Sequence, residues 1–135
     1  MRKKRVLILC TGNSCRSIMA EALINTKLGK CAEAESSGVK ASGKVNPQAR
    51  ALLEAKGYWR DNYHSKVIET VLGKSFDLVV TVCDHANETC PTFPKAVKTI
   101  HIAFEDPSGK AAEEYEKTLE LIDQELLPII KGELC

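Results

Sequence analysis

The chain has 135 residues, a length typical of one globular domain with an apolar core. Its 19 lysines and arginines balance 18 aspartates and glutamates, which argues against a nucleic-acid or membrane partner. After the basic start "MRKKR", the apolar run "VLILC" is too short for an export signal or a transmembrane segment. We therefore expect a single cytoplasmic domain over residues 1–135, monomeric, that acts on a small partner.

Hydrophobic periodicity predicts strands that alternate with helices. Asn46-Pro47 provides a cap and a first residue for one helix, and Pro128 should bend or end the last one. In chain order, the predicted elements are a strand over 6–9, a helix over 16–26, a strand over 32–37, a helix over 47–57, a short helix over 65–73, strands over 76–83 and 97–104, and a helix over 111–127.

This alternation indicates an α/β fold in which a parallel sheet is covered by helices on both faces. Such three-layer sheets bind their ligands at the carboxyl ends of the strands. Cys10 and Cys83 each end a predicted strand, and Asp106 closely follows another. We therefore expect these three residues to meet at one edge of the sheet.

The stretch "CTGNSCRS" has the features of an anion-binding loop. Gly12 and Asn13 can take left-handed conformations, which would wrap successive N–H groups around a tetrahedral oxyanion. The helix that starts near Arg16 points its positive end at the same place, and the guanidinium can hold two oxygens. The predicted oxyanion site consists of Thr11, Gly12, Asn13, Ser14, Cys15 and Arg16.

Cys10 lies at the base of this loop, where the N–H groups, the helix dipole and the Ser17 hydroxyl all favour a thiolate. We predict that Cys10 attacks the anion that Arg16 holds. The simpler alternative is a buried cysteine at the end of a strand, followed by an arginine at the start of a surface helix.

Five segments resemble the low-molecular-weight tyrosine phosphatase superfamily, and within it the thioredoxin-coupled arsenate reductases. They are "CTGNSCRSIMAE", "SSG" at residues 36–38, "DLVVTVC", Cys90 and "EDPSG". The resemblance spans essentially the whole chain and implies a four-stranded parallel sheet in the order 2-1-3-4. It also implies the reduction of arsenate to arsenite, which serves arsenic detoxification.

The resemblance assigns the steps of a three-cysteine relay. Cys10 attacks arsenic while Asp106 protonates the leaving hydroxyl. Cys83 then attacks Cys10, which releases arsenite and leaves a Cys10–Cys83 disulfide. Cys90 attacks Cys83 in turn, and thioredoxin, or another dithiol protein, reduces the Cys83–Cys90 disulfide.

Each later part of this assignment has a simpler alternative. The polar segment between Cys83 and Cys90 should form a helix-like turn that loops out on oxidation, but Cys83 could also merely pack under the sheet. Asp106 opens an Asp-Pro-Ser-Gly sequence that is common in turns and helix entries.

Two other functions are compatible with the sequence. The first is a low-molecular-weight tyrosine phosphatase that hydrolyses aryl phosphates through a phosphocysteine at Cys10. The polar Thr11 and Ser14, and the absence of aromatic residues after Asp106, favour a bare oxyanion, with weak phosphatase activity as a side reaction. The second is a redox-responsive regulator that uses its thiols without turnover.

We expect the remaining thiols to have minor roles and no metal or cofactor to be bound. Cys15 should support the loop or stay idle, Cys31 should lie at the surface or a helix end, and Cys135 should be a free thiol. Cys10, Cys15, Cys83 and Cys90 with His85 lack the C-x2-4-C spacing of a zinc site.

Some relatives of this type bind potassium beside the loop. The residues involved correspond here to Asn13, Glu21, Ser36 and an aspartate that Lys66 replaces in this chain. We hypothesise that the Lys66 ammonium lies near Glu21 and Asn13 and replaces the cation. The alternative is a solvated lysine at the start of a helix.

Overall fold

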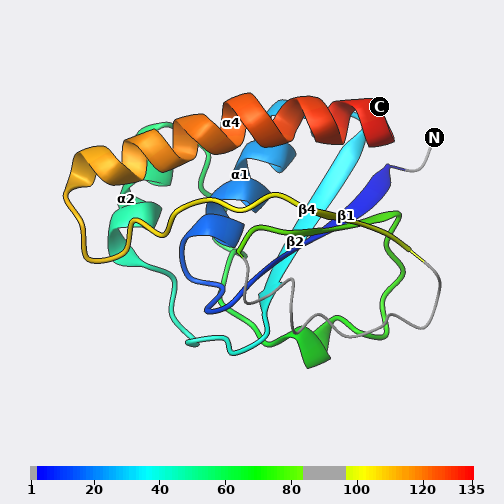
Figure 1. Cartoon of the computed structure of the whole chain (residues 1–135), viewed down its shortest axis with the longest axis horizontal. Coiled ribbons are helices and arrows are strands. Elements are labelled where there is room, and N and C mark those ends of the chain that lie inside the picture. The colour runs from blue at the N-terminus through cyan, green and yellow to red at the C-terminus, as the bar shows by residue number, and fades with distance from the viewer. Residues whose placement is uncertain (1–2, 84–96) are drawn as a thin grey trace.

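The protein is built around one parallel β-sheet, as the computed structural model describes for residues 3–83 and 97–135 (Figure 1). The four strands lie in the order β2-β1-β3-β4, so the predicted α/β class and strand order are confirmed. The strands are β1 (Lys4–Cys10), β2 (Ala32–Gly38), β3 (Leu78–Thr81) and β4 (Lys98–His101).

Strand β1 forms the centre of the sheet, with every residue from Val6 to Cys10 buried. A continuous apolar run of this kind is typical of a parallel strand covered on both faces. The register pairs Cys10 with Gly38 of β2 and Leu9 with Thr81 of β3. The carboxyl ends of these three strands therefore meet at one edge.

Among the described residues, the α-helices α1 (Arg16–Lys27), α2 (Pro47–Ala55) and α4 (Ala112–Leu134) lie on one side of the sheet (Figure 1). The predicted α-helices on the opposite face are not seen within residues 3–83 and 97–135. Helix α1 lies between the sheet and α4, so all its residues from Ser17 to Asn25 are buried. As predicted, Asn46 caps α2, since its Oδ1 accepts N–H groups of Gln48 and Ala49 at 2.9 and 3.2 Å.

Two expectations about the helices are wrong. The segment 65–73 forms only the short 3-10 helix η1 (Ile68–Thr70), because Val67 instead makes a parallel bridge with Gly38. Helix α4 does not end before Pro128 but continues to Leu134. Pro128 is exposed and Ile130 beyond it is fully buried, so packing on the core compensates for the missing N–H.

The expectation of a free Cys135 is also wrong, because this residue forms a disulfide bond with Cys31 at a Cα–Cα distance of 5.7 Å. Their pairing brings the last turn of α4 to the start of β2. Cys31 itself is half-buried and lies just after the end of α1, as expected. Among the described residues, none of the helices is long and apolar enough to cross a lipid bilayer.

Gly38 ends β2 directly against the loop that follows β1. A Cβ atom at this position would lie 2.6 Å from the carbonyl oxygen of Thr11 and 3.0 Å from the Cβ of Asn13. Only a glycine lets the two chain segments approach this closely without a shift of backbone.

The Gly38→Ala substitution should therefore lower the free energy of unfolding by about 1–3 kcal/mol, since the added methyl group overpacks the site. Gly73→Ala is the matched control, because nothing lies within 4 Å of a Cβ placed there. Its effect should stay within about 0.5 kcal/mol. Urea denaturation measures both, and equal losses would contradict the close contact at Gly38.

Candidate active site

In the loop that joins β1 to α1, residues 11–15, the carbonyl groups of Thr11, Gly12 and Ser14 point outward to neighbouring segments, as does the carbonyl of Cys10. Because N–H and C=O groups of a trans peptide point in opposite directions, the N–H groups that follow these carbonyls face the inside of the loop. This arrangement provides the concave set of donors that an oxyanion requires. The outward carbonyls accept N–H groups at 2.8–3.1 Å, Cys10 from Val39, Thr11 from Lys40, Gly12 from Ser42 and Ser14 from Asn46.

Helix α1 adds its positive end to the same cup. It begins at Arg16, as predicted, and its first turn holds no acidic residue. Cys15 precedes it as N-cap without a side-chain hydrogen bond. The partial positive charge of the first turn is therefore not neutralised within α1.

The Arg16 guanidinium connects the cup to the loop that follows β4. Its Nη1 donates a hydrogen bond to the carbonyl oxygen of Phe104 at 3.1 Å, and its Nη2 lies 3.6 Å from Oδ2 of Asp106. Sequence patterns identified Asp106 but not Phe104, because a backbone acceptor carries no residue signature. Arg16 and Asp106 are thus held together at the edge of the sheet.

Asn13 is fully buried and adopts a positive φ of 49°, so its predicted left-handed conformation is confirmed. The same expectation for Gly12 is wrong, since a single left-handed residue suffices for this turn. Asn13 Nδ2 donates to the hydroxyls of Ser17 at 2.8 Å and Ser36 at 2.9 Å. Its Oδ1 accepts the backbone N–H of Lys66 at 2.8 Å.

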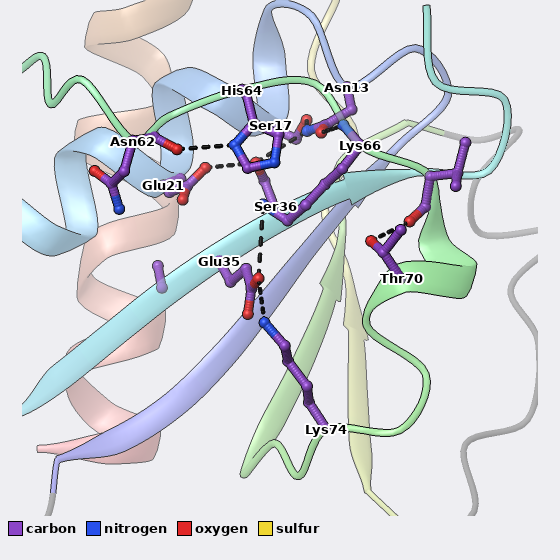
Figure 2. A network of polar contacts seen from close by, with 12 residues as sticks. Asn13, Ser17, Glu21, Glu35, Ser36, Asn62, His64, Lys66, Thr70 and Lys74 are labelled. Carbon is purple, nitrogen blue, oxygen red and sulfur yellow. Dashed lines mark hydrogen bonds and ion pairs between the residues drawn. The ribbon is translucent and has the colours of Figure 1, made fainter. Parts of the chain in front are cut away.

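Glu21 extends this network into α1 (Figure 2). The Ser36 hydroxyl, which accepts from Asn13, donates its own proton to Oε1 of Glu21 at 2.5 Å. Burial raises the pKa of Glu21 to about 7, against the opposing effects of the Ser36 hydrogen bond and the charge of Lys66. Glu21 is therefore partly protonated near neutral pH.

Lys66 contributes to the network through both its backbone and its side chain. Its backbone N–H holds Asn13, and its ammonium lies 3.7 Å from Oε1 of Glu35. The Lys66 side chain is only 12% exposed, so the alternative of a solvated lysine is wrong. Glu35, which sequence reasoning missed, also pairs with Arg5 and Lys74 at 3.4 and 2.8 Å.

Cys10 and Cys83 lie side by side at the ends of β1 and β3, where both are buried. Their side chains share a hydrogen bond, which together with burial raises the pKa of Cys10 above its ordinary value. Arg16 and the N–H of Thr11 lower this pKa but do not outweigh the increase. Burial and the Cys83 thiol thus oppose the predicted thiolate and favour a protonated Cys10 before an anion binds.

Two further contacts complete the thiol site. Oγ1 of Thr11 lies 3.2 Å from Sγ of Cys83, which fixes the second thiol against the loop. Cys15 is also buried, and burial raises its pKa to about 12, with a further increase from the charge of Asp106. Cys15 is therefore a poor nucleophile and fits its expected minor role.

Asp106 is half-exposed and ionised. Partial burial raises the pKa of Asp106, but hydrogen bonds from Ser108 and the charges of Arg16 and Lys110 outweigh that effect and hold it below its ordinary value. Its Oδ1 accepts the backbone N–H of Ser108 at 3.0 Å. The resting site thus keeps a proton on Cys10 and none on Asp106.

Cys90 and the polar segment before it lie outside the described residues, as does His85. His64 and His101 make hydrogen bonds to Asn62 and Thr81 at 2.9 and 2.8 Å. Within residues 3–83 and 97–135, no group of three or more His, Cys, Asp or Glu side chains is arranged to hold a metal ion.

Comparisons with known proteins agree with this geometry. Residues 5–132 match the family described as low molecular weight phosphotyrosine protein phosphatase. An arsenate reductase of Brevibacillus brevis is 42% identical over 115 residues, which are 85% of each chain. The crystal structure of arsenate reductase from Archaeoglobus fulgidus has a TM-score of 0.79 and 31% identity, and covers 93% of this chain and 98% of its own.

A low molecular weight protein tyrosine phosphatase from T. tengcongensis is equally similar in structure. Its TM-score is 0.80 at 31% identity, with 96% of this chain and 99% of that chain covered. The backbone therefore does not separate a reductase from a phosphatase, and the side chains of the site must decide.

The buried Glu21 should make stability depend on pH. Its pKa of about 7 exceeds its ordinary value of 4.5, so the folded state retains a proton that the unfolded state loses. The free energy of unfolding should fall as pH rises from 4.5 to above 7 by up to about 3 kcal/mol from this residue, and Glu21→Gln should abolish that contribution. Urea denaturation at a series of pH values measures the difference between the two proteins.

Lys66→Met is the matched test, because the Lys66 charge lowers the pKa of Glu21. Glu35 and Arg60 carry the other charges that affect this pKa. Removal of the Lys66 charge should raise the pKa of Glu21 further and extend the loss of stability to higher pH. If the free energy of unfolding changed with pH in parallel for the wild type and Glu21→Gln, the raised pKa of Glu21 would be contradicted.

Proposed function

Because the chain belongs to the low molecular weight phosphotyrosine protein phosphatase family, we propose that it is an arsenate reductase. The observation that carries the proposal is the pair of buried thiols, Cys10 and Cys83, which share a hydrogen bond beside the oxyanion loop. Hydrolysis of a phosphate ester needs one nucleophilic thiol. Reduction needs a second thiol within reach of the first, to take over the bond to sulfur.

In the first proposed step, an arsenate monoanion binds to the inward N–H groups of residues 11–15 and to the Arg16 guanidinium. Cys10 loses its proton and attacks arsenic, while a hydroxide leaves. The proton and the hydroxide form water. Ser17, which is held by Asn13, donates its hydroxyl proton toward the Cys10 sulfur as negative charge develops there.

Asp106 carries the proton in this step. Its resting carboxylate accepts the proton that Cys10 releases and then donates it to the departing hydroxide. This order is supported by the raised pKa of Cys10, by the lowered pKa of Asp106, and by the 3.6 Å between Arg16 Nη2 and Asp106 Oδ2. Oxyanion binding next to Arg16 raises the proton affinity of Asp106 because it adds negative charge.

In the second step, the Cys83 sulfur attacks the Cys10 sulfur. The sulfur–arsenic bond breaks, its electron pair reduces arsenic from the pentavalent to the trivalent state, and the Cys83 proton goes to the released arsenite. A Cys10–Cys83 disulfide is left, so two electrons have moved. The hydrogen bond between these thiols supports this step, because little movement is needed before they react.

In the third step, Cys90 attacks Cys83 and frees Cys10, and a dithiol protein of the thioredoxin class reduces the Cys83–Cys90 disulfide. We propose that this takes place in the cytoplasm, where such reductants keep thiols reduced. Residues 1–135 would act as one monomeric domain without a cofactor. Lys66, half-buried between Glu35 and the Asn13 network, would provide the positive charge that potassium supplies in relatives of this type.

Phosphatase activity is the second candidate function, favoured by the structural similarity to a tyrosine phosphatase. Cys10, Arg16 and Asp106 suffice for hydrolysis through a phosphocysteine. Ser108 and Gly109, which follow the Asp-Pro pair, provide no aromatic side chain to flank a phosphotyrosine ring. We therefore propose hydrolysis only as a weak side reaction.

A Cys90→Ala variant should stop the relay at its second step. Treatment of the reduced variant with arsenate should release one arsenite per chain and leave a Cys10–Cys83 disulfide, which non-reducing peptide mapping detects. Cys15→Ala in the same background should give the same product, because Cys15 has no part in the relay. Absence of an arsenate-dependent Cys10–Cys83 bond would disprove the relay.

An Asp106→Asn variant should slow single-turnover arsenate reduction at neutral pH by about 10²–10⁴-fold, the usual contribution of a positioned proton carrier. Rapid-quench measurement of arsenite gives the rate. Glu105→Gln is the control, since this exposed neighbour pairs with Lys110 and should keep the rate within about twofold. An unchanged rate in Asp106→Asn would disprove the role of Asp106.

A further inference from the structure

Two of the three cysteines that the relay leaves unused, Cys31 and Cys135, lie 104 residues apart in sequence and are joined by a disulfide bond. We propose that this pair is a second redox site. The disulfide clamps the end of α4 to the start of β2. A dithiol reductant opens the clamp, and the disulfide form of such a protein closes it by the reverse exchange. This inference concerns a different part of the molecule and does not rest on the proposed function.

The clamp lies at the opposite end of the sheet from the oxyanion loop. Cys31 immediately precedes β2, and its carbonyl oxygen accepts the N–H of Lys4, the first residue of β1, at 3.0 Å. Cys10 pairs with Gly38 at the far end of the same two strands. At about 3.3 Å per residue, the two redox sites are about 20 Å apart, too far for direct exchange of thiols. Figure 1 shows the C-terminal end of α4 near the start of β2.

The part of α4 that the disulfide holds, beyond Pro128, has fewer other stabilising contacts than the rest of the helix. Pro128 provides no N–H, so the helix beyond it lacks one hydrogen bond to the preceding turn. Ile130 still packs in the core, but Leu134 is only partly buried. A cross-link over so long a loop removes much conformational freedom from the unfolded chain.

The surroundings of the pair favour its reduction. Cys135 is exposed and Cys31 is partly buried, beside an open cavity of about 520 Å³. Within the described part of the chain, the residues that line this cavity include no acidic one, although Asp123 pairs with one of the lysines from outside it. Positive charge stabilises the thiolate that leaves during exchange. The cationic lining residues are Lys27, Lys30, Arg60 and Lys131.

The exchange balances with a dithiol alone. A thiolate of the reductant attacks the exposed sulfur of Cys135, the sulfur–sulfur bond breaks, and its electron pair goes to Cys31, which takes up a proton. The second thiol of the reductant then displaces Cys135, which is protonated in turn. The protein gains two electrons and two protons, and the reductant becomes a disulfide.

The test uses the full chain with Cys10→Ser, Cys83→Ser and Cys90→Ser, so that no relay disulfide can form. The melting temperature of this protein is measured after oxidation with diamide and after reduction with dithiothreitol, and peptide mapping identifies the linked peptides. Oxidation should join Cys31 to Cys135 and raise the melting temperature on the order of 10 °C. Adding Cys135→Ser should give one melting temperature in both states, equal to that of the reduced parent.

A second measurement separates a clamp from a passive cross-link. In native buffer, dithiothreitol should open the bond and speed amide hydrogen exchange in the turns of α4 beyond Pro128, while exchange in β1 stays unchanged. The proposal would be overturned if oxidation formed no Cys31–Cys135 bond, or if dithiothreitol in native buffer did not reduce that bond. Since no arsenate is used, failure here leaves the reductase proposal intact, and a failed arsenate assay leaves the clamp intact.

Discussion

The hydrogen bonds of the buried Asn13 side chain are the interactions on which the oxyanion loop depends. One amide group holds Ser17 of α1, Ser36 of β2 and the backbone of Lys66, and it fixes Asn13 itself in a left-handed conformation. Three segments far apart in sequence are thereby tied to a turn of five residues. Because the loop carbonyls are also bonded outward, the N–H groups face the anion site before any ligand arrives. The oxyanion-binding geometry is thus already formed in the folded protein, so the conformational entropy of the loop is lost on folding and not on binding.

The distribution of protons in the resting site follows from the same packing. Burial and the partner thiol keep Cys10 protonated, while Ser108, Arg16 and Lys110 keep Asp106 ionised. A nucleophile that is protonated at rest is protected from oxidation, because the thiolate is the reactive form. An arriving oxyanion next to Arg16 offsets the positive charge that lowers the pKa of Asp106, which raises the proton affinity of this carboxylate. In the proposed mechanism this prepares Asp106 to carry the proton.

Periodicity and local motifs predicted most of the strands and helices and the oxyanion loop, while the strand order and the relay came from the family resemblance. The apolar strand before Cys10, the spacing of Cys10 and Arg16, and the Asn46-Pro47 cap are local signals, and each has its predicted place in the structure. Features that depend on tertiary contacts could not be predicted. The helix continues through Pro128 because Ile130 packs in the core, Glu35 pairs with three cations from other segments, and Cys31 meets a residue 104 positions away. The influence of Cys83 on the pKa of Cys10 could not be predicted either, because a hydrogen bond between residues 73 positions apart leaves no pattern in the sequence.

The central claim is that Cys10 and Cys83 transfer electrons to an oxyanion instead of only binding it. The most direct measurement is the consumption of NADPH by the reduced protein with arsenate, thioredoxin and thioredoxin reductase, beside the hydrolysis of an aryl phosphate by the same preparation. We predict arsenate-dependent NADPH consumption that is lost in Cys10→Ser, Cys83→Ser and Cys90→Ser, with only slow hydrolysis of the aryl phosphate. Hydrolysis that requires Cys10 and Asp106 but neither Cys83 nor Cys90, with no NADPH consumed, would contradict it and identify a phosphatase.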